Sequence, residues 1–107
     1  MVKISDQLIE EMKDVIVREV DPEKIILFGS WATGQANEQS DVDLLVIERE
    51  SFGPNRCRRS EAARIWRCLS TFRVPKDILV YSSKELDQSP LAVTQALQEG
   101  KVLYESS

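Results

Sequence analysis

Two aspartates separated by a single residue, Asp41 and Asp43, are the side chains of this sequence best suited to chemistry. In an extended segment, residues two apart point to the same face, so the two carboxylates would lie side by side. Ionised carboxylates that close repel each other and raise one pKa unless a cation lies between them. A solvated strand end is the simpler alternative, but the apolar residues 44–47 that follow predict a buried strand. The pair therefore predicts a site for divalent cations.

A third acid, Asp77, opens the apolar run 78–80 and could lie beside the pair across a sheet. There it could bind a second cation and accept the proton of an attacking hydroxyl. An exposed residue at the start of a strand is an alternative of about equal weight. Because carboxylates favour hard cations, the expected metal is Mg²⁺, with Mn²⁺ as a substitute.

A Gly-Ser turn upstream is a candidate binding element for phosphate groups. Gly29 and Ser30 directly follow the apolar run 25–28, and glycine lets the chain turn sharply and lets a ligand approach the backbone. If a helical turn begins at residue 30, its unpaired N–H groups favour phosphate oxygens, and the Ser30 hydroxyl adds one donor. Gly-Ser alone is a common turn, so this interpretation depends on the acids downstream.

Composition excludes several other classes of protein. The chain has no histidine, and its two cysteines, Cys57 and Cys68, form no CxxC motif. This excludes histidine-based catalysis and histidine-containing zinc sites, and it predicts reduced thiols. The net charge of −4 argues against nonspecific nucleic-acid binding. No apolar run is long enough to span a membrane and the first residues predict no signal peptide, so we expect a cytoplasmic protein.

The segments FGSWATG (28–34) and SDVDLLV (40–46) resemble the signature of the DNA polymerase β nucleotidyltransferase superfamily. The strand that begins at Asp77 and the segment EGKVLY (99–104) resemble its minimal nucleotidyltransferase (MNT) branch. The resemblance implies an α/β fold with a small mixed sheet and helices packed against it. It also implies two Mg²⁺ ions held by the three acids, and an NTP bound at Gly29, Ser30, Gly34 and Ser40.

The resemblance further implies a reaction and a partner. The reaction is transfer of a nucleoside monophosphate, AMP from ATP, to an acceptor hydroxyl. Stand-alone MNT proteins commonly occur with a small helical HEPN-domain protein, often an RNase toxin, and neutralise it by binding it or by transferring AMP to it. A catalytically weak antitoxin that acts by contact is therefore the alternative function. Transfer to a small molecule ranks lower, because we expect no separate substrate domain; a homo-oligomer is compatible with the sequence.

The sequence departs from the family pattern between Ser30 and Gly34. Many relatives carry an arginine there, whereas this chain has Trp31, Ala32 and Thr33. Phosphate binding must then depend on backbone amides, on the metals, or on an arginine from the helix predicted over 56–73, which puts catalytic efficiency in question. Trp31 could stack on a base or take an ordinary packing role.

Half of the 14 basic residues fall between positions 56 and 76: Arg56, Arg58, Arg59, Arg64, Arg67, Arg73 and Lys76. Such a charge run is most often a solvated helix face. It could also be a docking surface for an acidic partner with Trp66 as its anchor, or a site for the phosphates of NTP or RNA.

Hydrophobic spacing predicts the elements that must position these residues within one domain, residues 1–107. A helix over 6–20 is expected to end at Asp21-Pro22. A second helix is expected to begin at Gly53-Pro54 and to fade near Phe72. Strands are predicted at 24–28, 41–47, 76–81 and 102–104. Ser82-Ser83 could cap a short helical turn. A last helix is predicted from Ser89-Pro90, with Ser89 as its cap, to Leu97, and Gly100 is expected to end it in the left-handed conformation.

Overall fold

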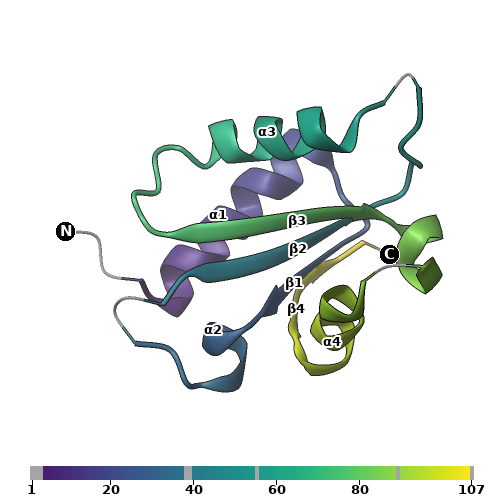
Figure 1. The fold of residues 1–107 in the computed structure, drawn as a ribbon. Helices are drawn as coiled ribbons and strands as arrows, with labels where there is room; N and C mark the ends of the chain where they lie inside the picture. The colour runs from purple at the N-terminus through teal and green to yellow at the C-terminus, as the bar shows by residue number, and fades with distance from the viewer. Residues whose placement is uncertain (1–3, 38–39, 55, 89, 107) are drawn as a thin grey trace.

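The computed structural model describes residues 4–37, 40–54, 56–88 and 90–106. Helices pack against a four-stranded sheet with strand order β3-β2-β1-β4 (Figure 1). β1 runs antiparallel to β2 and to β4, whereas β2 and β3 are parallel, so the sheet is mixed as predicted. The elements along the chain are α1 (Asp6–Val20), β1 (Lys24–Phe28), α2 (Ser30–Thr33), β2 (Val42–Glu48), α3 (Arg58–Cys68), β3 (Lys76–Ser82), the 3₁₀ helix η1 (Ser83–Gln88), α4 (Leu91–Glu99) and β4 (Lys101–Glu105).

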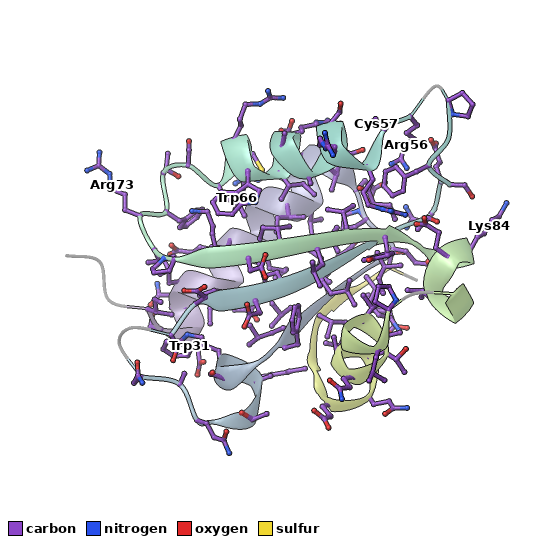
Figure 2. All side chains as sticks on the ribbon, viewed as in Figure 1. Trp31, Arg56, Cys57, Trp66, Arg73 and Lys84 are labelled. Atoms are coloured by element: carbon purple, nitrogen blue, oxygen red, sulfur yellow. The ribbon has the colours of Figure 1, made fainter. Side chains whose placement is uncertain are left out.

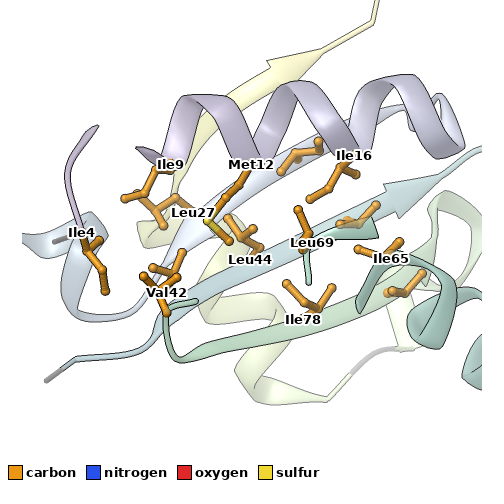
Figure 3. Packing of buried hydrophobic residues seen from close by; sticks show 14 residues of the cluster. Ile4, Ile9, Met12, Ile16, Leu27, Val42, Leu44, Ile65, Leu69 and Ile78 are labelled. Carbon is orange, nitrogen blue, oxygen red and sulfur yellow. The ribbon is translucent and has the colours of Figure 1, made fainter. Parts of the chain in front are cut away.

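The two faces of the sheet are covered differently. α1 and α3 pack on one face, where Val42, Leu44 and Val46 of β2 meet Ile65 and Leu69 of α3 and the apolar side of α1 (Figure 3). α4 packs on the other face, where Leu45 and Ile47 of β2 form a smaller cluster with Val93 and Ala96 of α4. Because strand residues alternate between faces, Asp43 belongs to the α4 face.

Local signals fix the ends of the first helix. Ser5 accepts a hydrogen bond from the backbone N–H of Leu8 and so caps α1. Asp21, in the left-handed region at φ 46°, ends the helix directly before Pro22. The predicted bounds of α1 and β1 are confirmed, and β3 and β4 extend at most one residue beyond each predicted end. β2 begins at Val42, so Asp41 lies just before the strand.

Two predicted boundaries are wrong. The second long helix begins at Arg58 instead of residues 53–54, because the backbones of Gly53 and Arg56 bond to each other and place Pro54 in a closed turn. α4 ends at Glu99, but Gly100 is extended (φ −75°, ψ 167°) and not left-handed. A β-carbon at position 100 would overlap the Ala96 carbonyl oxygen and the Ile26 side chain, so close packing requires glycine there. Ser89, predicted as a cap, lies outside the described residues.

No helix among the described residues is long and apolar enough to cross a membrane.

Candidate active site

The register of the sheet brings two of the three predicted acids together. In the parallel pairing of β2 with β3, Asp43 is the direct partner of Asp77, and on its other side Asp43 pairs with Phe28 of β1. The Val42 N–H donates to the Pro75 carbonyl oxygen (2.9 Å), which starts the ladder at the position that sets this register. Asp41 precedes β2, two residues from Asp43. The three acids therefore gather at one end of the sheet.

The electrostatics of this cluster are unfavourable for negative charge. Burial raises the pKa of the Asp43 carboxyl, and the negative charges of Asp77 and then Asp41 raise it further. Asp43 is half-buried, while Asp41 and Asp77 are exposed. Within the described part of the chain, none of the three takes part in an ion pair, although ten such pairs occur elsewhere. The cluster thus concentrates negative charge without a protein cation.

Gly29 forms the wall of this cluster on the β1 side. Its backbone (φ 73°, ψ −153°) lies in a region that is open almost only to glycine. A β-carbon at position 29 would overlap the Oδ2 atom of Asp43, so the missing side chain leaves room for the carboxylate. The Gly-Ser turn and the acid pair, separate in sequence, are thus in contact in space. A small hollow lined by Phe28, Gly29 and Thr33 on one side, and by α4 on the other, continues from the turn.

The helical turn predicted at residue 30 is present as α2. The N–H groups of Ala32 and Thr33 donate to the Gly29 carbonyl oxygen (3.1 and 3.2 Å), and Gly34, at φ 78°, ends the turn. Ser30 is therefore the first residue of the turn, where a helix has N–H groups without helical partners. α2 contains no basic side chain.

Trp31 has a positioning role that sequence reasoning left open. Its indole Nε1–H donates to the Ser40 carbonyl oxygen (3.2 Å), and its ring packs against the main core. The Ser40 hydroxyl accepts from the Asn37 N–H (3.0 Å). Trp31 thus fixes the residue that directly precedes Asp41, which supports the packing alternative. Pro75, whose carbonyl sets the β3 register, was not singled out from the sequence; its place directly before the strand was the available signal.

The basic helix does not reach the acids. α3 packs on the face opposite Asp43, and arginines within it and just before it are paired with glutamates of the chain itself. Arg64 binds Glu19 (3.0 Å), Arg56 binds Glu48 (2.6 Å), and Arg58 pairs with Glu85. The prediction that an α3 arginine neutralises substrate phosphates at the turn is therefore not supported.

The described residues contain no group of three carboxylates, thiols or imidazoles close enough to hold a metal ion by themselves. The Asp43–Asp77 pair nevertheless fits a divalent cation in chemistry and charge. Its oxygens are hard donors, its electrostatic repulsion is uncompensated, and both strands fix its position. A cation held there would need further ligands from a substrate, and phosphate oxygens are of the suitable type.

Comparisons with known proteins agree with this geometry. A family model described as "Polymerase beta, Nucleotidyltransferase" matches residues 10–107. Among curated proteins, no sequence matches the chain. A solved structure assigned as a minimal nucleotidyltransferase is 28% identical, with a TM-score of 0.58, and the match covers 90% of this chain and 92% of that one.

Two toxin–antitoxin structures share the fold at lower identity. One is a toxin–antitoxin complex with AMP-PNP, at 22% identity and a TM-score of 0.61, covering 92% of this chain and 74% of the other. The second is the tri-AMPylated Shewanella oneidensis HEPN toxin in complex with MNT antitoxin, at 19% identity and a TM-score of 0.60, covering 95% and 74%. The family match spans the Gly29 turn and the Asp43–Asp77 pair together, and the protein belongs to the polymerase β nucleotidyltransferase family.

Proposed function

We propose that this protein transfers AMP from ATP to a hydroxyl group of a HEPN-type partner protein and thereby acts as the antitoxin of a toxin–antitoxin pair. The observation that carries the proposal is the uncompensated Asp43–Asp77 pair in contact with the Gly29 turn. Family membership supports nucleotidyl transfer. The toxin complexes that share the fold, one with AMP-PNP and one AMPylated, motivate the choice of AMP and of the partner.

The chain's own residues suggest how the reaction proceeds. The acceptor oxygen attacks the α-phosphorus of ATP, the bond from that phosphorus to the bridging oxygen breaks, and pyrophosphate leaves. Asp77, exposed at the edge of the site, accepts the hydroxyl proton as general base. The backbone amides of Ser30 and Trp31, which precede the hydrogen-bonded amides of α2, and the Ser30 hydroxyl bind phosphate oxygens of the departing group. Gly29 keeps the backbone close to the acids.

Two Mg²⁺ ions would be held by Asp41, Asp43 and Asp77, with phosphate oxygens as further ligands. When bound, they neutralise the charge of the triphosphate and of the leaving pyrophosphate.

A contact antitoxin is the second candidate, and a specific observation favours it. α2 has no arginine, and α3 lies on the opposite face, so substrate phosphates receive little help from protein cations. A weak active site would leave binding as the main means of silencing the partner.

The Asp77→Asn variant separates the two candidates. If Asp77 is the general base, Mg-ATP should still raise the melting temperature of the variant, because Asp41 and Asp43 remain as ligands. Transfer of AMP to the HEPN-type partner should fall about 10²-fold or more. The measurement pairs radiolabel transfer with growth rescue of cells that express the partner. Rescue that survives without labelling would contradict the catalytic proposal and favour the contact antitoxin.

A further inference from the structure

The outer side of α3 carries arginines without ion pairs among the described residues, whereas the arginines near α1 are paired with glutamates. Arg59, Ala63, Trp66 and Arg67 follow helical spacing and are all exposed, as is Arg73 in the connection to β3. Whereas Arg56 and Arg64 are bound by glutamates, Arg59, Arg67 and Arg73 form no ion pair within the described residues. We call this surface, Arg59, Ala63, Trp66, Arg67 and Arg73, the Trp66 face.

Trp66 stands out at the centre of this surface. It is 43% exposed, a large apolar exposure for a tryptophan on a helix whose inner side is filled by Ile65 and Leu69. Its ring lies 4.9 Å from the Lys76 ammonium, which itself donates to the Phe72 carbonyl oxygen (3.0 Å). Trp66 is therefore held in place from beneath while its other side faces solvent. Fixed, partly exposed tryptophans flanked by arginine are typical anchors of protein interfaces.

The topology places this surface next to the active site. β3 is the outermost strand, and its first two residues, Lys76 and Asp77, point to opposite faces. Lys76 contacts Trp66 on the α3 side, and Asp77 belongs to the acid cluster on the α4 side. Figure 2 shows Trp66 and Arg73 toward the end where β3 begins, and Lys84 beyond its other end. A protein bound to the Trp66 face would therefore need to extend around only the edge strand β3 to contact Asp77.

We propose that the Trp66 face docks an acidic surface of the acceptor protein and holds it across the edge of β3, so that its hydroxyl reaches Asp77. This rests on the proposed function, which it extends by naming the recognition surface. The charge supports a protein partner of opposite sign: the chain has net charge −4, yet this face displays three unpaired arginines around one aromatic ring.

The test uses a defined probe, a fluorescein-labelled peptide of aspartate, glutamate and leucine, titrated by anisotropy at low ionic strength without metal or nucleotide. Trp66→Ala and Arg67→Glu should each weaken binding about tenfold or more. Lys84→Glu is the matched control, since it makes the same charge change at the far end of β3, and it should bind as wild type does. Circular dichroism should show that all three variants remain folded.

Each outcome decides the proposal. No binding, or equal weakening by Lys84→Glu and Arg67→Glu, would overturn it, because attraction would then be general and not local. If an oligouridylate RNA binds more tightly than the peptide, and Trp66→Ala weakens that binding, the result would contradict an acidic protein partner and indicate that this surface binds nucleic acid. Because the titration contains no ATP, it succeeds or fails independently of AMP transfer, and loss of transfer with intact peptide binding would reject only the proposed function.

Discussion

Strand β2 carries one carboxylate near each end: Asp43, which is half-buried, and Glu48, which is buried. The surroundings of the two carboxylates differ in charge. Asp43, near the start, lies beside Asp77 and Asp41 and has no ion pair with a protein cation among the described residues. Glu48, the last residue, is only 3% exposed, and its Oε1 binds the Arg56 guanidinium at 2.6 Å. Arg56 also binds Glu61 (3.1 Å), at the wall of a polar hollow of about 390 Å³. The two carboxylates also point to opposite faces of the sheet.

The pKa of each carboxyl lies above its ordinary value, and burial is the largest cause at both, but at Glu48 a protein cation opposes the shift. At Glu48, burial raises the pKa and Glu61 adds to it, while the nearby Arg56 lowers it. At Asp43, burial and the other two acids all raise it. A buried carboxylate with a protein cation is a structural element, whereas repulsion left uncompensated between neighbouring strands indicates that a cation comes from outside. The difference between the two ends therefore supports the proposal that a metal ion and a nucleotide bind at the Asp43 end.

The largest expected effect comes from removing the repulsion at the Asp43 end. Asp41→Asn combined with Asp43→Asn should abolish AMP transfer, because the cation ligands are lost. The free energy of unfolding should stay level or rise, since two mutually repelling charges disappear. A radiolabel transfer assay and urea denaturation measure the two halves. Glu11→Gln, which removes an exposed charge on α1, is the control and should leave transfer intact. Transfer that persists in the double variant would show that these acids bind no catalytic cation.

At the other end of β2, the opposite result is expected. Arg56→Leu leaves Glu48 buried without its main cation and should lower the free energy of unfolding by about 3 kcal/mol at neutral pH. Lys24→Met is the matched control: it removes the longer, more exposed pair with Glu105 (3.7 Å), so it should cost less than about 1 kcal/mol. Urea denaturation measures both. Equal costs for the two variants would remove the contrast between the ends.

The sequence predicts those parts of the fold and of the candidate site that depend on residues close together in the chain. The helix α1 and the strands follow from hydrophobic spacing and capping, which are encoded within a few residues. The side-by-side placement of Asp41 and Asp43 on an extended segment is also local. That Asp77 lies beside Asp43 is not local; it could only be expected as one alternative, because strand register depends on contacts such as the bond from Val42 to the Pro75 carbonyl.

Two of the predictions that the structure does not support share the same cause. Arg56 could bind substrate phosphates or Glu48, depending on which face of the sheet α3 covers. That face is set by the path of the connection from β2 to β3. The position of Gly100 predicts a left-handed helix end, but its backbone is extended. Glycine is required there because Ile26 and Ala96 leave no space for a side chain. The path of the crossover and the Ile26 side chain, which is far from Gly100 in sequence, create these constraints, so no local pattern reports them.

A smaller effect is expected from the glycine that joins the turn to the acid pair. Gly29→Ala forces a β-carbon against Asp43 in a backbone region that disfavours it, and should cost about 2 kcal/mol of stability. Gly34→Ala is the matched control, because Gly34 also has positive φ (78°) but open space around it. It should cost about 1 kcal/mol and preserve transfer, while Gly29→Ala should lose it. Similar transfer rates in both variants would contradict the proposed contact between turn and acids.

The smallest expected effect tests the sign of the electrostatics at Glu48. Because burial raises the pKa of this carboxyl, the folded state favours its neutral form, and that stabilisation is lost as pH rises through the folded pKa. Glu48→Gln is neutral at every pH, so at pH 7 it should be as stable as wild type or more stable by about 1 kcal/mol. The difference should vanish below the ordinary pKa of 4.5, where wild-type Glu48 is protonated too. Urea denaturation at both pH values measures it, and a variant less stable than wild type at pH 7 would show that the bond to Arg56 outweighs burial.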